Sequence, residues 1–203
     1  DDPGPMTEIP LFPLSAVLVP NGRMPLQIFE RRYLDLVRDC MRDNTGFGVI
    51  WIRRGPEVAA DTAGEPELGD YGTYARIVDW DQLPNGLLGI TIEGAERFEL
   101  GRSHRADSGL MMGEVEMHPV PEPEPVLDAW QSLVSVLRSL EGHPHVQRMG
   151  LSVDYNNAWD VAYTLVQLLP LEEQVKYELL GADSVDVLVR EMEIILNEIS
   201  GED

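Results

Sequence analysis

The chain has 203 residues, of which 43% are hydrophobic and 25% are charged, the proportions of a folded globular protein rather than a disordered one. It lacks the apolar run of about eighteen residues that a membrane span needs, and no basic stretch near its beginning leads into an apolar segment. We therefore expect a cytoplasmic protein with no membrane partner. The net charge of −21 argues against a nucleic-acid partner, because nucleic-acid binders gain affinity from cations that contact phosphates.

Residues 6–118 have the patterns of a mostly β subdomain. Three short apolar runs predict strands at Ile9–Phe12, Ala16–Val19 and Met24–Phe29. Asn21-Gly22 predicts a turn, because both residues tolerate positive φ. A helix is expected at about residues 30–43, ended by Asn44-Thr45-Gly46.

The predicted helix places Leu34, Val37 and Met41 on one apolar face. Cys40, the only cysteine, lies within it. A single cysteine excludes an internal disulfide and a multi-cysteine zinc site. We interpret Cys40 as a buried structural thiol, because a reactive cysteine needs an electropositive setting.

The next strands follow the helix in chain order. Phe47–Ile52 is a near-continuous apolar run, as expected of a strand covered on both faces. Residues 55–70 are rich in Gly, Pro, Ala and acidic residues and predict a loop. Gly72–Trp80 then alternates, which predicts that Val78 and Trp80 face away from Ile77.

A hairpin and a final strand complete the β subdomain. Pro84-Asn85-Gly86 predicts a turn from which Leu87–Ile92 returns. Gly94 predicts a bulge or bend that lets one long segment serve two parts of a barrel. Leu110–His118 is expected to pair back across a Ser103–Gly109 turn. Together these elements predict a small closed or semi-closed β barrel with one helix.

The prolines of residues 119–125 predict an extended linker, because they block both ladder and helix hydrogen bonds. Residues 126–200 then change to helical periodicity and predict a bundle of about four helices. The last predicted helix has Asp183 or Ser184 as its N-cap. The fold class expected is α+β.

Residue patterns for catalysis or metal binding are weak. His143-Pro144-His145 is the best metal candidate, but zinc sites need three or four ligands at recognisable spacing. We therefore favour an inter-helix loop in which Pro144 prevents the helix from continuing. His104 and His118 are isolated along the sequence, and Glu114 and Glu116 are expected to face water. Glu30-Arg31-Arg32-Tyr33 is interpreted as a structural cluster that fixes the helix start, with Glu30 reaching Tyr33 or Leu34. We predict no catalytic, metal or cofactor residues.

Three motifs near the beginning resemble the opening signature of the Lon protease N-terminal, substrate-binding domain: Ile9-Pro10-Leu11-Phe12-Pro13-Leu14, Val17-Leu18-Val19-Pro20-Asn21-Gly22, and Pro25 to Tyr33. Gly72 to Ile77, Gly94 to Phe98 and Leu168-Leu169-Pro170 are similar to later motifs of that family. The residues that carry the resemblance, mainly structural, are Pro10, Pro13, Leu14, Pro20, Gly22, Pro25, Leu26, Phe29, Glu30, Arg32, Tyr33, Gly72, Gly94, Arg97 and Phe98.

The resemblance implies a barrel of the pseudouridine-synthase-associated (PUA-like) type followed by a helical bundle, and a role in recognising proteins. It also implies a stand-alone form, because full-length Lon continues into ATPase and Ser-Lys peptidase modules. Lys176 is the only lysine and follows no glycine-rich loop, so neither a P-loop nor a Ser-Lys dyad is expected.

We expect a non-enzymatic module that binds exposed apolar polypeptide segments or a specific protein partner. The candidate peptide-binding residues are Met24, Pro25 and Met112, because methionines adapt to varied apolar side chains. The alternative for Met24 is that it plugs the barrel end. Two other functions stay open: a hydrolytic enzyme whose cleft leaves no motif, and a PUA-like nucleic-acid binder, which the charge disfavours.

Overall fold

The computed structural model describes residues 5–54 and 66–201, and by its internal contacts the chain divides into two compact units after Val120. The predicted loop at 55–70 lies mostly outside the described residues. Residues 67–70 already belong to a strand.

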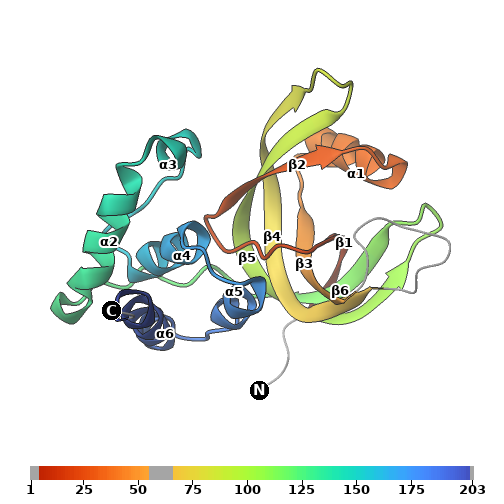
Figure 1. Cartoon of the computed structure of the whole chain (residues 1–203). Coiled ribbons are helices and arrows are strands. Elements are labelled where there is room, and N and C mark those ends of the chain that lie inside the picture. The colour runs from red at the N-terminus through yellow and green to blue at the C-terminus, as the bar shows by residue number, and fades with distance from the viewer. Residues whose placement is uncertain (1–4, 55–65, 202–203) are drawn as a thin grey trace. The chain divides into compact units, whose positions relative to one another are not determined.

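The first unit is a six-stranded mixed sheet with one helix (Figure 1). Its elements are β1 (Met6–Leu14), β2 (Arg23–Ile28), α1 (Arg31–Asp43), β3 (Phe47–Arg54), β4 (Glu67–Gln82), β5 (Leu88–Arg105) and β6 (Met111–Met117). The strand order is β2-β5-β4-β3-β1-β6, and β6 also pairs with β5, which closes the sheet into a barrel and leaves β2 as a flanking strand. β1 and β3 are parallel, with α1 in the connection between them, and the other pairs are antiparallel.

Strand β5 takes part in two regions of the sheet, as the glycine at position 94 predicts. Its first part, Leu88–Glu93, pairs with β2, and its last part, Phe98–Arg105, pairs with β6. At Gly94 a Cβ atom would lie 2.2 Å from the carbonyl oxygen of Val19, and the Gly94 amide donates to the Gly22 carbonyl at 2.9 Å. Only a residue without a side chain fits this close approach.

Helix α1 begins and ends close to the predicted bounds. Asn44 ends it in the left-handed conformation, with φ of 53° and its amide donating to the Cys40 carbonyl. Tyr33, Leu36, Val37 and Cys40 are buried, and burial raises the pKa of the Cys40 thiol. Met41, predicted on the buried face, is exposed, because the buried stripe runs through Leu36 and Cys40 instead.

Two predicted elements of the barrel are wrong. Ala16–Val19 is not a strand; it is a packed segment whose Leu18 carbonyl accepts a hydrogen bond from Thr73 Oγ1 at 2.7 Å. The residues from Ser103 to Arg105 continue β5, and the turn to β6 is later, with Gly109 at φ of 88°. Apolar runs indicate burial, but they do not distinguish strand pairing from side-chain packing.

The second unit is helical, with η1 (Asp128–Trp130), α2 (Gln131–Glu141), α3 (Pro144–Arg148), α4 (Ala158–Leu168), α5 (Glu173–Leu180) and α6 (Val185–Ser200). Helix α4 is apolar nearly all round and contacts α2, α5 and α6, so it is the centre of this unit (Figure 1). The loop predicted at residues 143–145 is wrong in part, because Pro144 begins the short helix α3 at its first turn, where proline is tolerated. This helix adds to the four predicted. Ser184 is the N-cap of α6 and accepts from the Val187 amide at 3.3 Å. Among the helices described, none is long and apolar enough to cross a membrane.

Candidate functional site

An incompletely covered apolar surface lies where β2, β5 and β4 run side by side. In antiparallel pairs, directly opposite residues share a face of the sheet. Ile92 of β5 is opposite Met24 and Ile77, and Ile90 is opposite Leu26 and Trp80. Leu88, two residues before Ile90, lies on the same face. We call this surface the ribbon face and define it by Met24, Leu26, Ile77, Trp80 and Leu88.

Trp80 reaches the ribbon face because of a β-bulge. The register of β4 against β5 shifts between Ile77 and Asp79, so three residues of β4 span two residues of β5. The prediction that Trp80 and Ile77 lie on opposite faces of the strand is therefore wrong, because the extra residue brings both side chains to the same face. The Trp80 side chain is 57% exposed. An indole this exposed is a large, rigid apolar contact surface of the kind enriched in protein interfaces.

The ribbon face is buried at one end and open at the other. Ile90 and Ile92 belong to the core that α1 covers, and the partly buried residues Met24, Leu26, Ile77 and Leu88 pack against that core. In Figure 1 the tip of the β4–β5 hairpin projects beyond α1. Phe29, directly after β2, is 56% exposed. The ribbon face thus presents the exposed ring of Trp80 on a base fixed by the core, and Phe29 is a second exposed ring directly after β2.

The three residues predicted to bind peptide do not share one face. Met24 lies on the ribbon face, half-buried, whereas Pro25 is opposite Thr91 and lies on the other face of β2. Met112 is on β6, opposite Pro10 and His104. The sequence analysis does not select Phe29 or Trp80, which their exposure makes candidate binding residues. No sequence signal marks the β4 bulge that places Trp80. Phe29 is one of the residues that carry the family resemblance, which the sequence analysis interprets as mainly structural.

Several signature residues at the start of α1 hold this helix to the barrel. Arg32 Nε donates to Glu30 Oε2 at 2.8 Å, and its Nη1 donates to the Gly109 carbonyl at 2.9 Å. The same guanidinium lies 4.6 Å from the centre of the Tyr33 ring, which stacks on Phe12 at 4.0 Å. These contacts agree with a structural interpretation of the cluster, and the side-chain partner of Glu30 is Arg32 rather than Tyr33 or Leu34.

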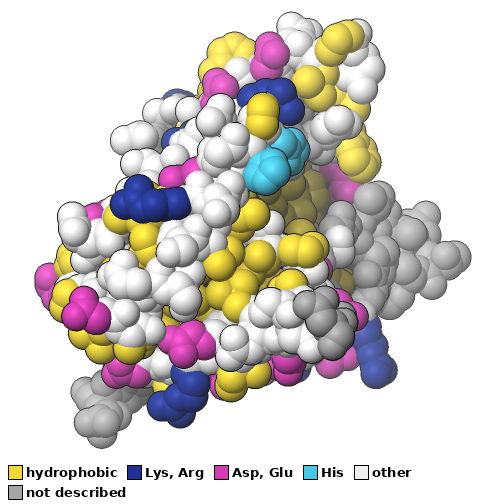
Figure 2. Space-filling view, turned by 60° about the vertical axis from the view of Figure 1, so that its left-hand side comes forward, with side chains coloured by type: hydrophobic (Ala, Val, Ile, Leu, Met, Phe, Trp, Pro, Cys, Tyr) yellow, Lys and Arg dark blue, Asp and Glu magenta, His cyan; other side chains and the backbone are white. Residues whose placement is uncertain are grey.

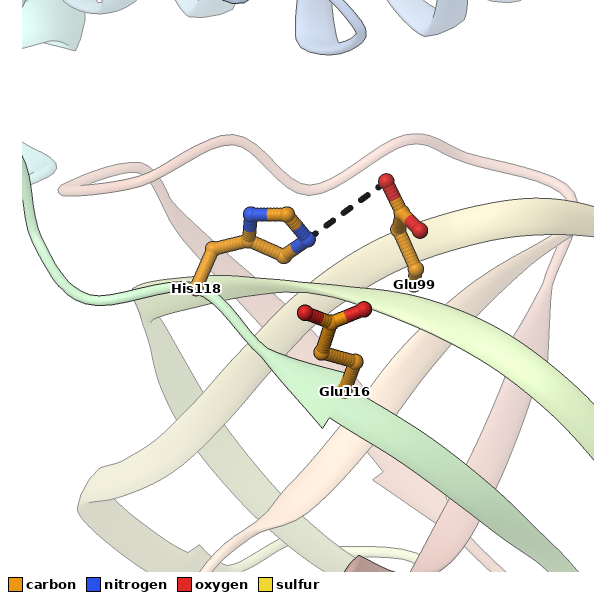
Figure 3. A group of neighbouring side chains, drawn as sticks. All are labelled: Glu99, Glu116 and His118. Carbon is orange, nitrogen blue, oxygen red and sulfur yellow. Dashed lines mark ion pairs between the residues drawn. The ribbon is translucent and has the colours of Figure 1, made fainter. Parts of the chain in front are cut away.

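A second group of polar residues comes together on the outer face of β5 and β6 (Figure 3). Glu99 and Glu116 are directly opposite in the ladder, and His118 Nε2 lies 3.5 Å from Glu99 Oε1. The possible ligand atoms of these three residues all lie within 4.8 Å of one another. His118 is therefore isolated only in sequence.

This cluster resembles a surface ion pair more than a metal centre. The Glu99 side chain is 64% exposed on an open strand face, where water competes for its carboxylate. Protein metal centres orient their ligands through further hydrogen bonds around the first shell. Within the part of the chain that the structure describes, candidate ligand atoms come together here, but Glu99 stays open to water, so we assign the cluster no metal.

The sequence matches the family model described as the ATP-dependent protease La (LON) substrate-binding domain over residues 8–198. The chain belongs to this Lon domain family. A solved Lon N-terminal domain protein from Xanthomonas campestris is 33% identical to it, with a TM-score of 0.70 and coverage of 94% of this chain and 97% of that one. The N-terminal domain of the Mycobacterium avium complex Lon protease has a TM-score of 0.60 at 16% identity, covering 97% and 99% of the two chains, which shows a shared fold alone.

Curated Lon proteases are similar over a part of their length. Lon protease 2 of Myxococcus xanthus is 30% identical over 93 residues, which are 45% of this chain and 11% of that protease. The Lon protease of Syntrophomonas wolfei is 23% identical over 193 residues, 94% of this chain and 21% of the protease. This Lon-type chain thus spans between a tenth and a quarter of these relatives. The predicted membership of the Lon domain family and the α+β fold class are confirmed.

Proposed function

We propose that this Lon-type domain is a non-enzymatic recognition module that binds exposed apolar segments of polypeptides on the ribbon face. The observation that carries the proposal is Trp80, which stays more than half exposed on a face whose other residues pack against the core. Phe29, directly after β2, is a second exposed aromatic residue. Family membership supports a role in substrate recognition, since the family is named for substrate binding. Hydrolysis of ATP or of polypeptide is not part of the proposed activity.

The physical argument rests on the kind of contact that an unfolded polypeptide offers. Such a chain exposes apolar side chains and needs a surface that buries them without demanding one sequence. The Trp80 ring, held on strand β4, loses little conformational freedom on binding. Met24, half-buried on the same face as Trp80, adds a flexible side chain that adapts to different partners.

The test measures binding of a fluorescently labelled, reduced and carboxymethylated α-lactalbumin, a permanently unfolded polypeptide. We expect Phe29→Ser combined with Trp80→Ser to weaken binding at least fivefold. The melting temperature should change little, because exposed side chains contribute little to stability. Met24→Ser should lower the melting temperature, since Met24 packs against the core, and Met112→Ser should leave binding unchanged.

The matched control is Val120→Ser combined with Leu127→Ser, which also removes two exposed apolar side chains but leaves the ribbon face intact. Binding equal to wild type in the Phe29/Trp80 variant would reject the ribbon face. Equal weakening in the control would mean that the probe adheres to apolar surface anywhere.

A further inference from the structure

Helices α5 and α6 of the second unit form a groove of about 460 Å³. The apolar part of its lining comes from Val175 and Leu179 of α5 and from Val187, Ile194 and Ile195 of α6. Val187 and Ile194 are 42% and 45% exposed, so the groove is open to a partner.

Helix α6 carries two apolar faces instead of the single stripe of an ordinary surface helix. Leu188, Val189 and Met192 are buried in the helical unit. Val187 and Ile194 are seven residues, or about two turns, apart, so they lie on the same side of the helix. This side differs from the one that carries the buried residues, and both Val187 and Ile194 line the groove. The second apolar face therefore lies partly at the surface, where it stays open to a partner.

Acidic residues complete the lining of the groove. Glu178 comes from α5, and Glu191 and Glu198 come from α6, where they are spaced two turns apart. No cationic side chain lines the groove among the described residues. Residues 121–203 hold 16 acidic and 4 basic residues, so the surroundings add to the negative potential. Figure 2 shows hydrophobic and acidic side chains intermixed on the side of the molecule where this unit comes forward.

We propose that the α5–α6 groove binds a basic amphipathic helical segment of a partner protein. The apolar side chains of the segment lie against Val187 and Ile194, and its Lys and Arg residues pair with Glu178, Glu191 and Glu198. Helix-in-groove binding uses apolar anchors spaced by three or four residues, and complementary charge sets the orientation and rejects acidic competitors. A second copy of this chain would bring its own glutamates to the groove and be repelled. This site is separate from the ribbon face and does not depend on it.

The test uses a labelled synthetic helical peptide of about 16 residues, long enough for four turns, with leucines on one face and lysines on the other. A matched peptide replaces each lysine by glutamate. Fluorescence anisotropy should show saturable binding of the basic peptide and no binding of the acidic one. Added salt should weaken the binding, because the ion pairs between the peptide lysines and the groove glutamates are exposed. Glu178→Lys, Glu191→Lys and Glu198→Lys together should weaken binding at least tenfold. Val187→Ser with Ile194→Ser should do the same and leave the helical circular dichroism unchanged.

The control variant carries Glu122→Lys, Glu124→Lys and Asp128→Lys, which change the net charge equally but do not line the groove. If the control weakens binding equally, the peptide is attracted by the net charge of the protein and not by the groove, and the proposal is overturned. Binding that survives both groove variants would overturn it as well. A dimer of the free protein that Val187→Ser with Ile194→Ser dissociates would assign the groove to a second copy, against the proposal. The ribbon-face variant should bind the peptide normally, which separates this test from that of the proposed function.

Discussion

Tyr155 shows how neighbours set the chemistry of a single residue in this protein. Burial and a hydrogen bond that its hydroxyl donates to Glu141 raise the pKa of Tyr155 to about 12, burial being the larger cause. The Arg138 guanidinium, 4.0 Å from the ring centre, acts in the opposite direction but more weakly. The contact joins the end of α2 to the segment before α4, and it depends on the protonated phenol.

Raising the pH into the alkaline range should therefore lower the free energy of unfolding of the helical unit, because Tyr155 loses its proton. The folded protein holds this proton more tightly than the unfolded chain, whose tyrosine has the ordinary value of 10.0. The stabilisation is fully present below pH 10 and is lost as pH rises toward 12. Absorbance titration of the phenolates should show one group with a midpoint near 12 that Tyr155→Phe removes. A Tyr155→Phe difference curve centred near pH 10 would contradict this.

At the scale of the strands, a single position decides whether the long β5 can bend. We expect Gly94→Ala to destabilise the barrel by about 1–3 kcal/mol, the usual range for overpacking. The new methyl would lie 2.2 Å from the Val19 carbonyl oxygen, which is backbone and cannot rotate away. Urea denaturation measures the decrease in the free energy of unfolding.

Gly142→Ala is the matched control for this substitution. A Cβ there meets nothing closer than 3.4 Å and the backbone is right-handed helical, so its effect should stay within about 0.5 kcal/mol. Equal stability of the two variants would show that β5 and the Val17–Pro20 segment separate without loss.

Local chemistry made part of this fold predictable. Asn21 and Asn44 have positive φ, as their residue type indicates. The helix follows from its periodicity, and the strand after it follows from its near-continuous apolar run. The face of Trp80 was not predictable, because one extra residue in a bulge reverses the alternation and leaves no mark in the sequence. For the candidate site, Met24 was found by residue type. The exposure of Phe29 and Trp80 depends on how the elements pack together, which only the assembled structure determines.

The whole molecule has a net charge of −21, with acidic excess in both the 1–120 and 121–203 segments. At moderate salt we expect no saturable binding of single- or double-stranded DNA or RNA at micromolar protein, because few cations are present to displace counterions. Electrophoretic mobility shift or anisotropy measures this. A tight complex whose affinity falls steeply with added salt would contradict the prediction, since that dependence requires several phosphate contacts.

The position of β1 fixes when the barrel can be completed during synthesis. β1 lies between β3 and β6, and Met6 pairs with Glu116, so within the barrel the first strand to be synthesised waits for the last one. Until β6 emerges, β1 keeps one edge without its ladder partner, and unpaired edges of incomplete sheets invite aggregation. Pairing of strands this distant along the chain is also intrinsically slow. The nascent barrel therefore spends most of its synthesis as an open sheet, and this interval is when it most needs protection by chaperones.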